Sequence, residues 1–313
     1  MSEEIGRRQP PDGGRERTKN LVAGAPVSWG VIEIPDWGYQ MPAGRVLEEA
    51  ASLGLEAMEA GPEGFLPDDP AEVRAKLAEH GLRLVGGFVP AVLHRPEVLE
   101  EELSFVERRA RFFEAAGAGV IVLAASTGSE SYEEVVELDE GGWRALFEGL
   151  SRVEEIAERH GLAVALHPHY GTVIETDEAL WRFLGGSETG LCLDTGHLVI
   201  GGSDPVEVAR RSARRVELVH LKDVDRSLAE RVANRELSFK EAAGRGMFRP
   251  LGEGDVDVAG VVRHLEEGGY PGWYVLEQDT VVDCEPEVGD GPIENVRKSL
   301  SYLQGELEKE AGK

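Results

Sequence analysis

The feature that most constrains the fold is a repeat in which a predicted helix ends at glycine and a short apolar run follows at once. The junctions read HGLRL from residue 80, AGAGV from residue 116, HGLAV from residue 160 and GGYPGW from residue 268. Glycine is favoured just past a helix end, and short uninterrupted apolar runs are typical of strands that are covered on both faces. The repeat therefore predicts helices that alternate with parallel strands.

Eight such units can be counted along the chain, and they predict a single (β/α)₈ barrel, the TIM barrel. A doubly wound open sheet is the alternative, but the first strand is not followed by the glycine-rich phosphate turn of that fold. The predicted strands are 21–30, 55–61, 82–92, 120–125, 162–167, 191–193, 216–221 and 273–277. The predicted helices are 45–53, 70–80, 97–116, 143–160, 177–184, 204–215, 258–267 and 293–308.

Two segments stand outside this repeat. Residues 1–20 mix both charge signs with Pro and Gly and lack an apolar core, so we expect a disordered N-terminal arm before a barrel of residues 21–313. The segment at about 225–256, after the seventh strand, is long and polar and ends in PLGEGD. A long loop at this end of a barrel is a candidate lid over the active site.

Composition excludes several classes of partner. The 313 residues carry a formal net charge of −26, which repels nucleic-acid phosphates and anionic membranes. No apolar run approaches the roughly 18–20 residues that span a bilayer. Cys192 and Cys284 are the only two cysteines, which argues against a disulfide framework and fits a reducing compartment. We therefore expect a cytoplasmic protein that binds neither nucleic acid nor membranes.

Polar residues gather where the predicted strands end. The carboxyl ends of barrel strands converge on one pocket, so these side chains are expected to meet there. A single histidine at such a place is more often a structural residue, and Glu59 alone would be explained by an ion pair or a helix cap. Glu277 ends an otherwise apolar strand, where an unpaired buried carboxylate is unfavourable. The expected rim residues are Trp29, Glu59, His167, His169, Asp194, His197, His220, Lys222, Glu277 and Asp279.

The combination of residue types at the rim predicts a metal site. Strands five to eight contribute two carboxylates and two imidazoles at four consecutive positions around the barrel. Such a mixed nitrogen and oxygen set suits Mn²⁺, Co²⁺, Fe²⁺ or Zn²⁺ and does not suit Ca²⁺.

The order of five motifs resembles the xylose isomerase-like barrel superfamily of sugar isomerases and epimerases. The motifs are ALHPHYGT, LDTGH, VHLKD, PLGEGDVD and VLEQD. Within this superfamily the chain is most similar to the myo-inosose-2 dehydratase family, whose SF-x-x-A-x-x-x-G-x-F pattern is matched by residues 238–248. The resemblance extends from about residue 21 to residue 303.

The resemblance implies four metal ligands, which in the superfamily are Glu, Asp, His and Glu. The last three fall on Asp194, His220 and Glu277. The first falls on His167, which departs from the pattern, and His169 is the alternative at this position. Epimerases of the superfamily are thought to use the two glutamates as a paired acid and base, so the loss of the first one favours the dehydratase family.

The resemblance further implies that the enzyme is a hydro-lyase. It would dehydrate a polyol ketone, above all 2-keto-myo-inositol (inosose), through an enediolate, with Mn²⁺ or Co²⁺ as the first candidate metals and Zn²⁺, Fe²⁺ or Mg²⁺ as further ones. Lys222 and His169 are the candidates for general acid and base in an order left open, Glu277 is counted with them, and Trp29, Glu59 and His197 would bind substrate. Glutathione as an added requirement and a homodimer or homotetramer are implied by the resemblance alone.

Three alternatives remain open at this point. A sugar or sugar-acid isomerase or epimerase would use the same metal without losing water. A metal-dependent endonuclease on the same kind of barrel would need more His and Asp ligands and a basic surface, against which the charge of −26 weighs. A non-catalytic carbohydrate-binding barrel would bind the polyol without metal dependence or turnover.

Overall fold

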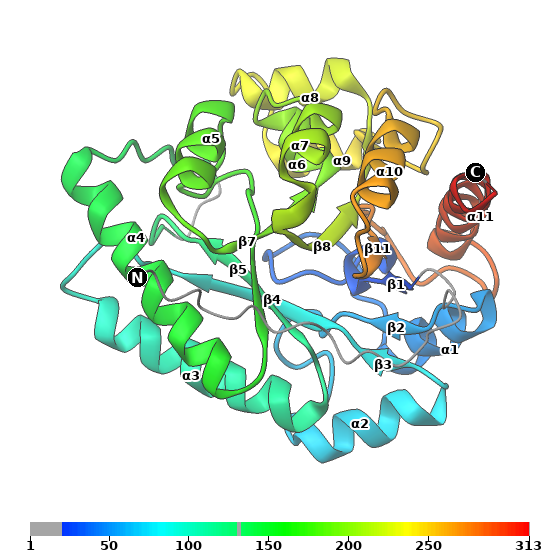
Figure 1. Ribbon diagram of the computed structural model, residues 1–313. Helices are drawn as coiled ribbons and strands as arrows, with labels where there is room; N and C mark the ends of the chain where they lie inside the picture. The colour runs from blue at the N-terminus through cyan, green and yellow to red at the C-terminus, as the bar shows by residue number, and fades with distance from the viewer. Residues whose placement is uncertain (1–20, 130–132, 313) are drawn as a thin grey trace.

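Parallel strands form a barrel with helices around it in the computed structural model, which describes residues 21–129 and 133–312 (Figure 1). The predicted arm of residues 1–20 lies outside the described residues. The strands follow the order β3-β2-β1-β11-β8-β7-β6-β5-β4 in one sheet, and the prediction of a TIM barrel is confirmed. Their bounds are β1 Val22–Gly24, β2 Ala57–Met58, β3 Arg83–Leu84, β4 Gly86–Ala91, β5 Val120–Ala125, β6 Ala163–Leu166, β7 Gly190–Asp194, β8 Val216–Leu221 and β11 Tyr274–Leu276.

The two ends of this sheet meet within one stretch of chain. β3 and β4 are separated only by Val85, whose N–H donates to the Met58 carbonyl at 3.0 Å. Just beyond, the Ala60 N–H donates to the Gly86 carbonyl at 2.9 Å. Since β3 pairs with β2 and β4 pairs with β5, the single predicted strand of residues 82–92 closes the barrel.

The predicted helices form with bounds that differ by a few residues. Gly54 and Gly117 follow the first and third of them with φ of 82° and 81°, a conformation that glycine adopts without strain. Figure 1 shows the last helix beside the first, where it completes the outer ring. The helices are α1 Ala43–Leu53, α2 Pro70–Glu79, α3 Leu99–Ala116, α4 Glu140–Arg159, α5 Asp177–Gly186, α7 Pro205–Ser212, α10 Val258–Glu267 and α11 Pro292–Ala311.

Two regions differ from the sequence prediction. The first strand ends at Gly24 and not at Gly30, because Pro26 begins a short 3₁₀ helix, Pro26–Trp29, and proline has no N–H for the sheet. The long segment after β8 is partly helical. It contains α8 Arg226–Ala233 and α9 Phe239–Gly244, and its β10 Phe248–Arg249 pairs with β9 Asp223–Val224. A further short helix, α6 Thr195–Ile200, directly follows β7.

The barrel interior explains why the predicted rim residues converge. One layer of inward-facing side chains, almost all aliphatic, comprises Ala23, Ala25, Ala57, Val85, Val120, Val122, Ala165, Cys192, Leu218 and Val275. Alternate residues of a strand share a face, so the residue two positions later also points inward. For five of these strands that next residue is Glu59, His167, Asp194, His220 or Glu277.

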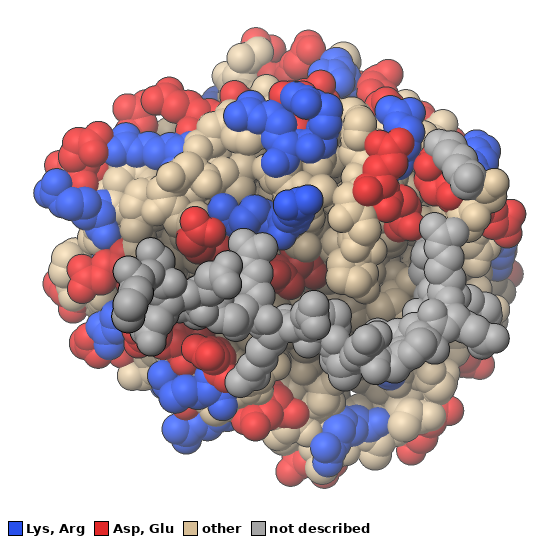
Figure 2. All heavy atoms as spheres, viewed as in Figure 1, with Lys and Arg blue, Asp and Glu red and all other residues tan. Residues whose placement is uncertain are grey.

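The outer surface carries its charge in mixed patches. On the face in Figure 2, acidic and basic side chains of the described residues lie side by side. Between α3 and α4, for example, Arg159 pairs with Glu107 at 2.6 Å. Among the described helices, none has an apolar stretch that could cross a bilayer.

Barrel closure predicts a strict requirement for glycine at position 86. A Cβ at Gly86 would lie 2.1 Å from the Val120 carbonyl oxygen, a backbone atom, whereas a Cβ at Gly119 would meet nothing within 4 Å. We expect Gly86→Ala to lower the free energy of unfolding by about 1–3 kcal/mol, as overpacking does, and Gly119→Ala to change it little. Urea unfolding followed by circular dichroism measures both. Equal stability of the two variants would contradict this closure.

Candidate active site

A cavity of about 920 Å³ opens at the carboxyl end of the barrel strands. Seven of the predicted rim residues line it: Glu59, His167, His169, His220, Lys222, Glu277 and Asp279. All of them except His169 are buried beneath the surface, so the cavity floor is made of polar groups that water barely reaches.

Asp194 lies behind this floor, in contact with residues that line the cavity, and has no exposed surface. Its Oδ1 accepts the His197 N–H at 2.8 Å and so caps the N-terminus of α6, which explains how the DTGH motif turns from strand to helix. Its Oδ2 lies 3.2 Å from His167 Nε2, 3.4 Å from Lys222 Nζ and 3.6 Å from His220 Nδ1. One carboxylate therefore contacts three elements of the rim.

His220 is oriented by Glu59. The two side chains are 2.9 Å apart between His220 Nε2 and Glu59 Oε1. This contact leaves Nδ1 of the ring facing Glu277, whose Oε2 is 3.2 Å away. Glu59, predicted to bind substrate, thus lines the cavity and also holds this histidine.

Lys222 is surrounded by acids. Its Nζ lies 2.9 Å from Glu277 Oε2 and 3.2 Å from Asp279 Oδ2, in addition to Asp194. Burial alone would lower the pKa of Lys222, but these carboxylates outweigh burial and hold that pKa well above its usual value. The ammonium stays charged near neutral pH.

Gly196 of the DTGH motif leaves space for the Lys222 side chain. A Cβ at Gly196 would lie 2.7 Å from the Lys222 Cβ, and Thr195 Oγ1 accepts the Lys222 N–H at 2.8 Å. The small residues of this motif therefore place the lysine as well as the aspartate.

The rings of His169 and His197 are in contact, tilted by 35° with centroids 3.8 Å apart. His169 Nδ1 is 2.7 Å from the Tyr170 carbonyl oxygen, so it donates its proton there and leaves the lone pair on Nε2. Burial, together with His167 and Lys222, lowers the pKa of His169 to about 3, and the ring is neutral. His197 is also stacked on Phe239 of α9, with ring centroids 5.8 Å apart.

Two predicted substrate-binding residues are not on the cavity wall. Trp29 is fully buried because the 3₁₀ helix turns it into the core, where its indole N–H donates to Glu49 Oε2 at 2.9 Å. His197 lies behind the wall because α6 carries it beneath α9, and its Nδ1 accepts the Tyr170 N–H at 3.3 Å. Both residues therefore lie off the cavity wall, and their contact with substrate stays a prediction.

The sequence analysis missed a segment that covers the cavity. Residues 31–38 lie along it, with Trp37 held by a hydrogen bond of 2.8 Å from its indole N–H to the Thr280 carbonyl. Trp37 also contacts Phe239 of α9, with ring centroids 6.2 Å apart. The signal was the length of the connection between the first strand and the first helix, because long loops at this end of a barrel bear on function.

The rim residues fit a divalent cation. Four carboxylates, those of Glu59, Asp194, Glu277 and Asp279, are buried at the rim, and three of them contact the one ammonium of Lys222. Among the described residues, Nδ1 of His167 and of His220 is buried without a hydrogen-bond partner. Donor atoms within 4.8 Å of one another form the sets His167–Asp194–His197, Glu59–His220–Glu277 and His167–Cys192–His220, and His169 belongs to none of them.

Asp223, which follows Lys222, stabilises the backbone at the end of the long segment after β8. Its two oxygens accept four backbone N–H groups at 2.8–3.0 Å, those of Val224, Gly252, Gly254 and Val256. A Cβ at Gly254 would lie 2.3 Å from Asp223 Oδ1, which explains a glycine of the PLGEGD motif. Asp223 thus acts as a clamp, because its hydrogen bonds hold residues 252–256 of the long segment against β9.

Comparisons with known proteins agree with this geometry. A family model described as xylose isomerase-like TIM barrel matches residues 47–305. The inosose dehydratase of Geobacillus kaustophilus is 34% identical over 277 residues, which cover 84% of this chain and 89% of that protein. An L-ribulose 3-epimerase structure superposes with a TM-score of 0.69 at 16% identity, covering 94% of this chain and 96% of that one. The IOLI protein with a bound zinc atom superposes with a TM-score of 0.66 at 15% identity over 92% and 98% of the chains, and these two structures share the fold.

The clamp at Asp223 can be tested against a second aspartate. Asp223→Asn would turn an amide NH₂ toward backbone donors, so we expect about 1–3 kcal/mol of destabilisation and faster proteolysis within residues 245–256. Asp204→Asn is the matched control, because Asp204 accepts one N–H as the N-cap of α7 and asparagine caps equally well. Thermal unfolding and limited proteolysis give the comparison. Unchanged stability of Asp223→Asn would exclude the clamp.

Proposed function

This chain belongs to the xylose isomerase-like TIM barrel family and is an enzyme of the hydro-lyase class, and we propose that it dehydrates a polyol ketone with a divalent metal ion. The proposed substrate is 2-keto-myo-inositol. The observation that carries the proposal is the buried rim cluster, in which a charged Lys222 and a neutral His169 flank a set of metal-ligating side chains. The likeness to an inosose dehydratase supports the choice of substrate.

His167, Asp194, His220 and Glu277 would hold the metal. A divalent ion there supplies Lewis acidity that polarises the ketone and makes the neighbouring C–H more acidic. His167 is favoured over His169 as a ligand because it contacts Asp194 at 3.2 Å. The choice among Mn²⁺, Co²⁺ and Zn²⁺, a need for glutathione and a homo-oligomeric state remain predictions.

His169 is the proposed base. Its Nδ1–H is held by the Tyr170 carbonyl, so Nε2 is the atom that accepts a proton from the carbon next to the ketone. His197 at 3.8 Å and Phe239 at 6.4 Å, measured between ring centroids, pack against the ring and limit its rotation. Removal of this proton leaves an enediolate on the substrate.

Lys222 is the proposed acid. The β C–O bond breaks as Lys222 Nζ gives a proton to the leaving hydroxyl, which departs as water. The carboxylates of Glu277 and Asp279 beside Nζ keep the lysine charged until it acts. The C–H proton goes to His169 and the leaving oxygen takes its proton from Lys222, so one molecule of water is lost overall.

The contact between Trp37 and Phe239 assists this chemistry. Residues 31–38 lie along the cavity, and this contact joins them to α9, which does not line it. An enclosed cavity strengthens the electrostatic interactions within it and keeps solvent from the enediolate. Substrate of the size of a six-membered polyol ring would be held beneath residues 31–38.

Proton NMR in D₂O tests the reaction. With Co²⁺ or Mn²⁺ present, we expect 2-keto-myo-inositol to lose carbinol signals while a new signal of the dehydrated ring grows, and we expect EDTA to stop the change. Deuterium entering next to the ketone with every hydroxyl retained would favour an isomerase or epimerase instead. No change with any of these metals would refute the proposed substrate.

The role of His169 can be separated from that of a ligand. We expect His169→Gln to lower kcat by about 10²–10⁴-fold, the range for loss of a general base, with Co²⁺ affinity by calorimetry nearly unchanged. His264→Gln, on the outer helix α10, is the control and should retain full kcat. Loss of Co²⁺ binding in His169→Gln would make this residue a ligand and not the base.

A further inference from the structure

Cys192 is the one polar side chain in the described aliphatic layer beneath the rim. It precedes Asp194 by two residues on β7, so both side chains face the barrel interior. The other members of the layer are Ala, Val and Leu, and the Cys192 side chain has no exposed surface. A buried cysteine often serves only as a small apolar residue, so position alone assigns it no further role.

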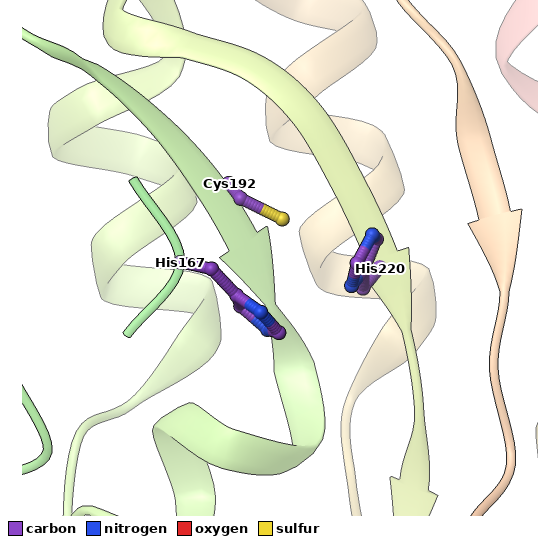
Figure 3. Close-up of side chains that lie close together, drawn as sticks. All are labelled: His167, Cys192 and His220. Carbon is purple, nitrogen blue, oxygen red and sulfur yellow. The ribbon is translucent and has the colours of Figure 1, made fainter. Parts of the chain in front are cut away.

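The surroundings of the Cys192 sulfur point to a ligand. One ring nitrogen of His167, one of His220 and Cys192 Sγ lie within 4.8 Å of one another. Figure 3 shows the sulfur pointing from β7 into the space between the two imidazole rings. Both rings are buried, and Nδ1 of each lacks a hydrogen-bond partner among the described residues.

We propose that Cys192 is a sulfur ligand of the divalent ion at the rim and makes the site selective for Co²⁺ or Zn²⁺ over Mn²⁺ and Mg²⁺. This inference rests on the metal site of the proposed function. It names the ligand that would make this site bind some of the candidate metals more tightly than others. Thiolate ligands favour softer ions, whereas a site of imidazole and carboxylate alone also accepts Mn²⁺.

The geometry allows one ion to contact all three side chains. Metal–sulfur and metal–nitrogen distances of about 2.3 and 2.0–2.1 Å place neighbouring ligands of one ion roughly 3–4 Å apart. Rotations that move the donor atoms by about 1 Å bring the observed set to that spacing. As the metal–sulfur bond forms, the S–H bond breaks and its proton leaves to the solvent, so no oxidant or reductant is involved.

Cys192 would then add a sulfur donor to the ligands of the proposed function. Asp194 Oδ2 already lies 3.2 Å from His167 and 3.6 Å from His220. With Glu277, 3.2 Å from His220 and next to Lys222, two imidazoles, two carboxylates and one thiolate would be available as donors.

Absorption spectroscopy of the Co²⁺-loaded full chain, without substrate, tests the inference. A cobalt–thiolate bond gives an intense near-ultraviolet charge-transfer band, whereas oxygen and nitrogen ligands give only the weaker visible d–d bands. We expect the charge-transfer band in the wild-type protein and in Cys284→Ser, which changes the exposed cysteine. Cys192→Ser should lose it while keeping d–d bands.

A competition experiment gives an independent readout. We expect Cys192→Ser to lose Co²⁺ and Zn²⁺ affinity by about tenfold or more, with a smaller change for Mn²⁺. Visible d–d bands without a charge-transfer band in the wild-type protein would overturn the role of Cys192 and leave the proposed metal site intact. No Co²⁺ binding by the wild-type protein would overturn both. If Cys192→Ser does not fold, the presence or absence of the charge-transfer band in the wild-type protein still tests the role of Cys192.

Discussion

The buried carboxylate of Asp194 is the interaction on which the rest of the site depends. It caps α6 with one oxygen and contacts His167, His220 and Lys222 with the other. A charge with no exposed surface is tolerated only when it is paired and hydrogen-bonded, so the surrounding groups are required together. The helix that Asp194 begins carries His197, which supports His169. The end of β7, the helix α6 and the proposed proton-transfer residues His169 and Lys222 are therefore coupled through Asp194.

Much of this arrangement was predictable from the sequence, because two local rules act on it. Glycine after several of the helices marks the repeat that becomes the barrel, as at Gly54 and Gly117. The two-residue period of a strand then fixes which residues face inward. Aliphatic residues at Ala165, Leu218 and Val275 are followed two positions later by His167, His220 and Glu277, so the strand pattern alone brings the candidate ligands to one place.

What the sequence did not predict depends on contacts between distant segments. Trp29 was expected at the pocket, but a proline three residues earlier turns it toward Glu49. The segment after β8 was expected to be a loop, although Ser238 and Glu241 form a capping box that starts α9. The contact of α9 with Trp37, more than two hundred residues away in sequence, has no local signal. Local patterns set the strand ends, and tertiary packing decides what closes over them.

The central claim is that the side chains around Asp194 form one divalent metal site. Anomalous diffraction at the cobalt edge, from crystals grown with Co²⁺, tests it most directly. The account predicts a single strong peak within bonding distance of Asp194, His220 and at least one further rim residue. A protein saturated with Co²⁺ whose anomalous peaks all lie away from these side chains would contradict it.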